Sequence, residues 1–310
     1  MSIKAESIYK LYGKQKALDN VSFNIKPGEI VGLLGPNGAG KTTMMKILTC
    51  FIPPTSGKAL VCGHDVMESP LEVRKKVGYL PENNPLYLDM YVREYLRFMA
   101  GIHKLGKDAK SRIEEIIKVT GLVPEQHKKL GALSKGFRQR AGLAQALIHD
   151  PEVLILDEPT SGLDPNQLVE IRNLIESAGQ KKTVVLSTHI MQEVEAICDR
   201  VIIIHNGKII ADAPTAELQV INQAKRIINV EFDNEIPEEE LKKIEGIKEV
   251  TKEKENSYKV FIAGEEDLRP KIFNFAVANN RVILSINLEE QSLEEIFRTL
   301  TTTEEEINVV

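Results

Sequence analysis

The chain contains 310 residues, of which 42% are hydrophobic and 27% are charged, as is typical of folded globular domains rather than of disordered segments. At about 150 residues per domain, this length predicts two domains. The formal net charge of -5 at pH 7 argues against a general nucleic-acid-binding protein, because such proteins carry a basic excess on one face.

Neither membrane spans nor disulfides are indicated. The N-terminal residues MSIKAESIYK lack the apolar region of a secretory signal, and no run approaches the roughly 18 apolar residues that span a bilayer. Cys50, Cys62 and Cys198 have neither the spacing of a metal site nor the even number of a disulfide framework. The sequence therefore predicts free thiols in a reducing compartment and a chain without a membrane span.

The first half of the chain indicates strands followed by a helical segment. A turn signal at 26–29 leads into a buried apolar run, which feeds a glycine-rich loop and a helix. Residues 85–150 contain no strand-like run and predict a separate helical subdomain. The expected elements are strands at 8–13, 17–25 and 30–34 and helices at 42–50, 93–101, 109–120 and 137–149.

From residue 153 onward, strands and helices alternate in the manner of a parallel α/β sheet. Asp164 is suited to cap the helix that follows it, and Pro165 fits the first helical position. The expected elements are strands at 153–156, 183–187 and 201–204 and helices at 166–177 and 191–198.

After about Leu218 the composition shifts, and the remaining residues indicate a small α+β domain. Its Glu- and Lys-rich stretch, 235–255, mixes both signs of charge and predicts a solvated surface rather than a binding tail. We therefore expect two domains, 1–218 and 219–310, of which the second is accessory or regulatory. The expected elements of the second are strands at 226–232, 258–262 and 281–286 and helices at 237–245, 268–278 and 292–299.

A glycine-rich loop between an apolar strand and a helix predicts a phosphate site. Its glycines let backbone N–H groups point inward, and the following helix directs its positive end to the same place. Lys41 can reach the β- and γ-phosphates of ATP, and the Thr42 hydroxyl can ligate Mg²⁺. The predicted nucleotide-binding residues of this loop are Gly35, Pro36, Asn37, Gly38, Ala39, Gly40, Lys41, Thr42 and Thr43.

Two further positions carry polar groups suited to a nucleotide site. Asp157 ends an apolar strand, where its carboxylate can hold Mg²⁺, and Glu158 is suited to act on a water near the γ-phosphate. Ser134 and Gly136 precede a helix and present a hydroxyl, N–H groups and a helix N-terminus to an anion. The alternatives are purely structural: the carboxylate pair could cap a helix, and Ser134 could merely cap its own.

The string GPNGAGKTT and the block LSKGFRQRAGLAQALIHDPEVLILDEPTSGLD at 133–164 resemble the ATP-binding subunits of ABC transporters, over roughly residues 3–218. The resemblance implies an α/β, P-loop NTPase ABC ATPase fold with a mixed β-subdomain, a parallel-sheet core and a helical subdomain. It implies that Glu158 polarises the attacking water and that His189 is the switch histidine. By itself, a lone histidine is usually an ordinary core or surface residue.

The same resemblance implies that Tyr12 stacks on adenine, although an aromatic at this place could also simply pack at a strand end. It further implies that Ser134 and Gly136 bind the γ-phosphate of a partner's ATP, so that two chains enclose two nucleotides head to tail. Asp164, which ends the block, is counted among the nucleotide-binding residues.

The chain departs from the family pattern at three positions. Lys135 and Phe137 replace the first glycine and the glutamine of the usual LSGGQ turn. Glu82 stands where most members carry a glutamine that senses Mg²⁺ and the membrane subunit. A carboxylate there can still ligate Mg²⁺, but it adds negative charge near the γ-phosphate. The alternative for Glu82 is a surface residue without a site role.

The Glu82 loop, the Ser-Lys-Gly turn and the C-terminal extension through 293–297 resemble the ATPases of ABC-2-type exporters, and the segments 83–96 and 164–175 resemble the gliding-motility-associated subunit. The expected protein is thus an ATPase that dimerises with itself and drives an integral membrane permease from the cytoplasmic face, with no nucleic-acid partner. A soluble ABC-type ATPase acting on nucleic acid or the ribosome is the alternative, disfavoured by the single cassette and acidic charge. A simple P-loop kinase would not need the Ser134 turn.

Overall fold

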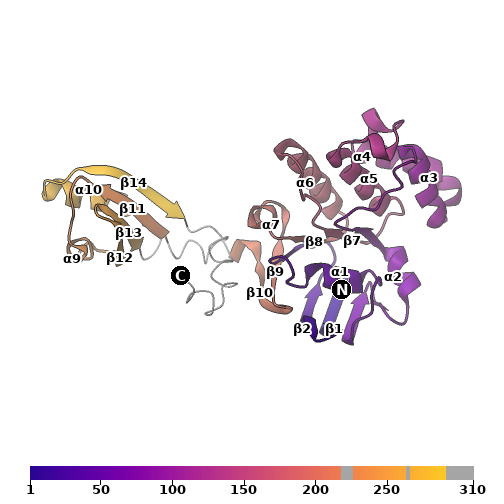
Figure 1. The fold of residues 1–310 in the computed structure, drawn as a ribbon, viewed down its shortest axis with the longest axis horizontal. Helices are drawn as coiled ribbons and strands as arrows, with labels where there is room; N and C mark the ends of the chain where they lie inside the picture. The colour runs from indigo at the N-terminus through magenta and orange to yellow at the C-terminus, as the bar shows by residue number, and fades with distance from the viewer. Residues whose placement is uncertain (218–225, 263–265, 291–310) are drawn as a thin grey trace. The chain divides into compact units, whose positions relative to one another are not determined.

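The computed structural model describes residues 1–217, 226–262 and 266–290 (Figure 1). The chain divides into two compact units, Met1–Thr215 and Ala216–Val310, which are treated separately below. The expected boundary at Leu218, the expected helix at 292–299 and the extension at 293–297 lie outside the described residues. The boundary therefore stays a prediction.

An antiparallel sheet in the order β2-β1-β4-β5 opens the first unit. The strand expected at 8–13 begins earlier, at Ile3, because register shifts between Ala5 and Ile8 interrupt the simple alternation of buried and exposed residues. The strand at 56–61 was not expected, and its first half is exposed. The four strands are β1 (Ile3–Tyr12), β2 (Gln15–Ile25), β4 (Ser56–Val61) and β5 (His64–Asp65).

The central sheet has six strands in the order β10-β9-β3-β8-β7-β6. The expected parallel sheet is confirmed for β3, β7, β8 and β9; β6, which also runs parallel, and β10, which pairs antiparallel with β9 at the edge, were not expected. Every residue of β7 and β8 is buried, as expected for strands covered on both faces. The strands are β3 (Ile30–Leu34), β6 (Val77–Leu80), β7 (Val153–Asp157), β8 (Thr183–Thr188), β9 (Arg200–His205) and β10 (Lys208–Pro214).

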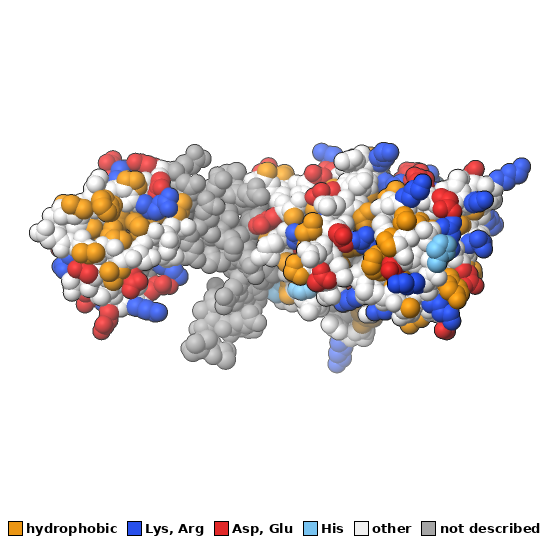
Figure 2. All heavy atoms as spheres, turned by 90° about the horizontal axis from the view of Figure 1, so that it is seen from above, with side chains coloured by type: hydrophobic (Ala, Val, Ile, Leu, Met, Phe, Trp, Pro, Cys, Tyr) orange, Lys and Arg blue, Asp and Glu red, His pale blue; other side chains and the backbone are white. Residues whose placement is uncertain are grey.

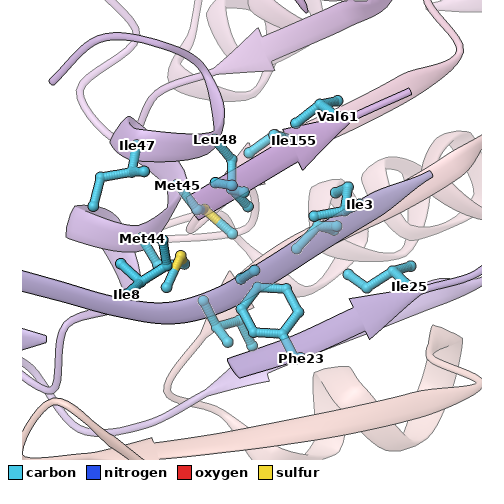
Figure 3. Packing of buried hydrophobic residues seen from close by; sticks show 14 of the residues in the cluster. Ile3, Ile8, Phe23, Ile25, Met44, Met45, Ile47, Leu48, Val61 and Ile155 are labelled. Carbon is cyan, nitrogen blue, oxygen red and sulfur yellow. The ribbon is translucent and has the colours of Figure 1, made fainter. Parts of the chain in front are cut away.

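Helix α1 (Lys41–Leu48) packs between the two sheets and fixes the glycine-rich loop at its N-terminus. Figure 3 shows Met44 beside Ile8 of β1, within a cluster that also holds Met45 and Leu48. Burying such side chains stabilises the fold by about 1.5–3 kcal/mol each. This packing holds the positive end of α1 at the carboxyl end of β3.

The expected helical subdomain contains α3 (Val92–Ile102), α4 (Ala109–Val119) and α5 (Lys135–Leu147). All three helices were expected within two residues of these bounds, and α5 begins directly after its cap Ser134. Other α-helices of the unit are α2 (Pro70–Lys76), which was not expected, α6 (Pro165–Gly179) and α7 (Met191–Ile197). Within the described residues, no helix has the length and apolar character needed to cross a membrane.

The described residues of the second unit form a four-stranded antiparallel sheet in the order β12-β13-β11-β14, with two helices, which confirms the expected α+β character. One strand lies inside the Glu- and Lys-rich stretch and was missed, because Val250 is its only buried residue. Acidic and basic side chains are intermixed on the face seen in Figure 2. The elements are β11 (Arg226–Phe232), α9 (Glu238–Leu241), β12 (Ile247–Lys254), β13 (Ser257–Ile262), α10 (Arg269–Ala278) and β14 (Ile283–Glu290).

Candidate functional site

The loop between β3 and α1 curls around the side chain of Lys41. Gly40 has a φ of 112°, and a Cβ there would lie 2.5 Å from the carbonyl oxygen of Ala17, so this position requires glycine. Lys41 is buried, and its Nζ donates hydrogen bonds to the carbonyl oxygens of Gly35 at 2.6 Å and Pro36 at 3.3 Å. An ammonium group held in this loop is placed to meet an incoming anion.

A pocket of about 450 Å³ opens over this loop, within the range typical of small-molecule sites. It brings Tyr12 and Glu82 together with the loop and Glu158, as the family resemblance implies. Gln15 and Ala17 of β2 also line it and were missed, because neither belongs to a recognisable motif. The lining residues are Tyr12, Gln15, Ala17, Pro36, Asn37, Gly38, Ala39, Gly40, Lys41, Thr42, Thr43, Glu82 and Glu158.

Tyr12 offers an accessible aromatic face at the edge of this pocket. Its side chain is 48% exposed although it ends a strand, and Nζ of Lys10 lies 5.2 Å from the ring centroid. A ring packed only to close the strand end would be more buried, so this exposure favours stacking on a flat ligand. The nearby lysine adds positive charge where a nucleotide would lie.

Asp157 is the centre of a buried hydrogen-bond network. It is 1% exposed, and its Oδ1 accepts hydrogen bonds from Oγ1 of Thr42 at 3.1 Å and Oγ of Ser187 at 2.6 Å. Oδ2 of Asp157 is buried without a hydrogen-bond partner among the described residues. A buried carboxylate oxygen of this kind fits a cation ligand, and Thr42 supplies a second oxygen beside it.

Elsewhere among the described residues, no group of three or more His, Cys, Asp or Glu side chains gathers to hold a metal by itself. This is compatible with Mg²⁺, which proteins usually bind through one or two carboxylates together with substrate phosphates. Ser187, which supports Asp157 from the neighbouring strand, was missed because its partner is 30 residues away in sequence.

Glu158 lies between a cation and an imidazole. Its Oε1 is 3.4 Å from Nζ of Lys41, and its Oε2 accepts a hydrogen bond of 3.0 Å from Nδ1 of His189. The residue is buried and has a φ of 48°, a strained conformation that clusters at functional sites, and its backbone N–H donates to Oγ of Ser187 at 2.9 Å. The structure thus brings Glu158 and His189 together.

Ser134, Gly136 and Asp164 do not line this pocket. Ser134 caps α5 by accepting a hydrogen bond of 3.3 Å from the N–H of Phe137, and Asp164 caps α6 in the same way through Gln167. A Cβ at Gly136 would lie 2.5 Å from the side chain of Gln167, so the N-terminus of α5 packs closely against the start of α6.

The two residues that depart from the usual turn make contacts of their own. The side chain of Lys135 reaches the Ser161–Asp164 segment, since a Cβ on Gly162 would lie 2.1 Å from its Nζ. The ring of Phe137 lies 5.4 Å from the guanidinium carbon of Arg140. Both substitutions are therefore accommodated without disturbing Ser134.

Helix α5 is tied to two loops of the pocket by residues that sequence reasoning missed. Nδ2 of Asn84, which follows Glu82, donates to the carbonyl oxygen of Arg138 at 2.8 Å. Nε2 of the buried Gln139 donates to the carbonyl oxygen of Pro159 at 2.8 Å. The helix that begins at Ser134 thus contacts both the Glu82 loop and the loop after Glu158.

Comparisons with known proteins agree with this arrangement. A family model described as ABC transporter matches residues 18–161, and one described as the C-terminal domain of DrrA1-3-like ATP-binding proteins matches residues 221–301. The bacitracin transport ATP-binding protein BcrA of Bacillus licheniformis is 36% identical over 310 positions, covering 95% of each chain. The linearmycin resistance ATP-binding protein LnrL of Bacillus subtilis (strain 168) is 33% identical over 306 positions, covering 96% of this chain and 98% of LnrL.

Among solved structures, the ATP-binding cassette MJ0796, a dimer in a post-hydrolysis state bound to ADP and Pi, is similar with a TM-score of 0.64 and 27% identity. The match covers 69% of this chain and 98% of that one. Together with the nearly full-length relatives, this similarity shows the family of the chain. The chain belongs to the ATP-binding proteins of ABC transporters, in the DrrA- and BcrA-like exporter branch, and is an ATPase whose hydrolysis of ATP drives transport.

Proposed function

We propose that two copies of this chain close head to tail around two ATP molecules and thereby drive a separate membrane subunit that exports its cargo. The observation that carries this proposal is the position of Ser134 and Gly136. They lie at the N-terminus of the 13-residue helix α5 but outside the pocket of their own chain. Their anion-binding groups therefore serve a nucleotide held by a partner. The dimeric MJ0796 cassette supports this arrangement.

Within each site, Glu158 takes a proton from the attacking water, and His189 orients its carboxylate through the 3.0 Å hydrogen bond. Thr42 and Asp157, together with Glu82, which lines the same pocket as Thr42, would hold Mg²⁺. When bound, this ion neutralises charge on the phosphate oxygens. The buried Oδ2 of Asp157, which has no partner among the described residues, supports this ligand set.

The substitution Glu158→Gln tests the catalytic assignment. It keeps the shape of the side chain but removes the basic carboxylate, so we expect retained ATP binding, a stabilised ATP-dependent dimer and loss of turnover. Gel filtration with ATP and a phosphate-release assay measure these properties. Glu176→Gln, at an exposed position of α6, is the matched control and should behave as wild type. Wild-type turnover in E158Q would contradict the assignment.

The membrane partner would dock on the helical subdomain near the Glu82 loop, at the cytoplasmic face of the membrane. Three large hydrophobic side chains are exposed just after this loop: Tyr87 at 58%, Leu88 at 53% and Tyr91 at 49%. Exposed apolar groups this close together are suited to a protein interface. Purification from membranes should recover an integral subunit with the chain. Recovery with ribosomes and no membrane protein would favour the nucleic-acid alternative instead.

The cargo of the proposed exporter has two candidates. The segments 83–96 and 164–175 support a gliding-motility exporter, whereas two nearly full-length relatives are named for bacitracin transport and linearmycin resistance. We propose export by an ABC-2-type complex. A deletion strain, assayed in parallel for surface gliding and for sensitivity to bacitracin and linearmycin, identifies the cargo. Loss of gliding alone supports the motility assignment, and increased sensitivity alone supports drug export.

A further inference from the structure

A second buried hydrogen-bond network lies beside the one that holds Asp157. Its centre is Glu193 on α7, which is 2% exposed although it carries an ionisable carboxylate. One carboxylate oxygen accepts a hydrogen bond from Oγ1 of Thr160, and the other accepts one of 2.6 Å from Oγ1 of Thr188. A carboxylate is costly to bury without such partners, so this arrangement requires both hydroxyl groups.

The two threonines flank the groups assigned to catalysis. Thr160 follows Glu158 by two residues and leads into the segment that ends at Asp164. Thr188 immediately precedes His189, and its Oγ1 also accepts a hydrogen bond of 3.0 Å from the N–H of Ile190. Glu193 therefore joins the loop that follows β7 to the last residue of β8, directly before His189.

The backbone of Thr188 extends this connection to the phosphate loop. Its carbonyl oxygen accepts a hydrogen bond of 3.3 Å from the N–H of Gly35, the first residue of that loop. The network around Glu193 thus contacts three segments of the active site without lining the nucleotide pocket itself. A side chain in this place acts on the reaction only through the loops that it holds.

We propose that Glu193 is a positioning residue for ATP hydrolysis, which fixes the loops of Glu158 and His189 relative to each other. The inference rests on the catalytic roles proposed above. Glu158 has a φ of 48°, and a conformation of this kind persists only where the surroundings over-determine it. His189 has a side chain that is 44% exposed, so burial alone does not fix its ring. Loss of the Glu193 bridge lets both loops relax and breaks the Glu158–His189 geometry.

The carboxylate itself is needed because two donors converge on separate oxygens. In Glu193→Gln, one of these oxygens becomes an amide nitrogen, so one threonine hydroxyl loses its acceptor while the volume is unchanged. In Thr160→Val or Thr188→Val, the donor disappears and Glu193 keeps its charge. Each of the three substitutions therefore removes at least one of the two hydrogen bonds that connect Thr160 and Thr188 through Glu193.

The test compares steady-state ATP hydrolysis by E193Q, T160V, T188V and the double variant E193Q/T188V. A misplacement of about 1 Å can cost about 100-fold in rate, so we expect E193Q to lower kcat by roughly 10- to 100-fold. KM for ATP should change by less than about threefold, because the pocket lining is intact. The double variant should be no slower than the slower single variant, because both changes break one bridge.

The matched control is Glu195→Gln, the same substitution at an exposed position on the same helix, which should hydrolyse ATP like wild type. Thermal unfolding checks that each variant is folded. If E193Q does not fold, the two valine variants, which replace hydroxyls by methyl groups of similar size, still decide the question. Wild-type kcat in folded T160V and T188V, or losses that multiply fully in the double variant, would overturn the proposal.

A second measurement separates positioning from general stability. The NMR signals of the His189 ring, identified by their absence in His189→Gln, should move in E193Q and stay in place in E195Q. Unmoved signals in a folded E193Q would overturn the proposal. E158Q is assayed in parallel: if it keeps wild-type turnover while E193Q is slow, the base assignment fails and the positioning role of Glu193 stands. If E158Q is inactive and E193Q is not slow, only the positioning role fails.

Discussion

The side chain of Asn84 occupies the space where residue 142 would otherwise place a Cβ: this Cβ would lie 2.5 Å from Oδ1 of Asn84 and 2.6 Å from a methyl group of Leu80. Gly142 lies in α5, the helix capped by Ser134. The absence of a side chain therefore lets the loop that carries Glu82 pack directly on α5, the helix that we propose faces a partner's nucleotide.

Gly142→Ala should loosen this contact. The added methyl group overpacks the site, so we expect a loss of about 1–3 kcal/mol in the free energy of unfolding, measured with urea. ATP binding should stay near wild type, whereas ATP hydrolysis should fall several-fold because the contact that holds α5 against the Glu82 loop is weakened. Gly101→Ala in α3, where no atom lies within 4 Å of the added Cβ, is the control and should not destabilise the fold. Wild-type stability in G142A would contradict the inference that the side chain of Asn84 packs tightly against Gly142.

Mixing two inactive variants should restore activity if Ser134 acts on a partner's nucleotide. Lys41→Ala removes the phosphate-binding lysine, and Ser134→Ala removes the hydroxyl at the start of α5. In a mixed dimer, both defects fall in one composite site and the other site is intact. We therefore expect phosphate release from the mixture to exceed that of either variant alone, and to rise steeply with protein concentration. No recovery, together with activity independent of concentration, would favour a monomeric P-loop enzyme.

Stability should decrease as the pH falls from about 6.5 toward 4, because the partly buried His149 is held in its neutral form. Burial lowers the pKa of His149 from 6.5 to about 4, and its ring stacks on His103, whose pKa burial also lowers. In this range the unfolded chain binds a proton that the folded chain does not, so folding loses stability on acidification. Partial solvent access reduces the effect to about 1–2 kcal/mol.

His149→Gln provides the check on this pH dependence. Its amide can still donate to the carbonyl oxygen of Val77, which accepts a 3.1 Å hydrogen bond from Nε2 of His149, but it does not titrate. Urea unfolding of this variant at several pH values between 7 and 4 should show a flatter profile than wild type. His127→Gln, at an exposed histidine of the same subdomain, should keep the wild-type profile.

A fragment that ends at Leu218 should fold and bind ATP. All residues that line the nucleotide pocket precede Thr215, where the first compact unit ends. The dissociation constant for a fluorescent ATP analogue should therefore match that of the full chain. A folded fragment without nucleotide affinity would contradict the expected boundary.

Sequence motifs predicted those parts of the site that are local in the chain. The loop around Lys41 and the pair Asp157–Glu158 each follow a buried strand, so neighbouring residues carry both the chemistry and its placement. Ser187 and Asn84 could not be found in this way. Their partners lie 30 and 54 residues away, and only the assembled sheet and helix bring them together.

The contrast between local patterns and distant contacts also explains which strands and helices could be predicted. The fully buried β7 and the capped α5 have clear local patterns, and both were expected near their observed bounds. β4 and β12 were missed because exposed residues dominate them, and they exist as strands mainly through hydrogen bonds to their neighbours. The pattern of apolar residues cannot predict strands that depend on such hydrogen bonds.

The 3.4 Å approach of Lys41 to Glu158 affects how nucleotide affinity is interpreted. The proposed phosphate-binding cation and the proposed base form one ion pair in the absence of ATP, so part of the attraction between lysine and phosphate is spent on separating this pair. Neutralising Glu158 releases Lys41 in advance. If E158Q binds ATP more tightly, part of the increase in affinity then comes from the freed Lys41. Only the rest of the increase comes from the loss of hydrolysis.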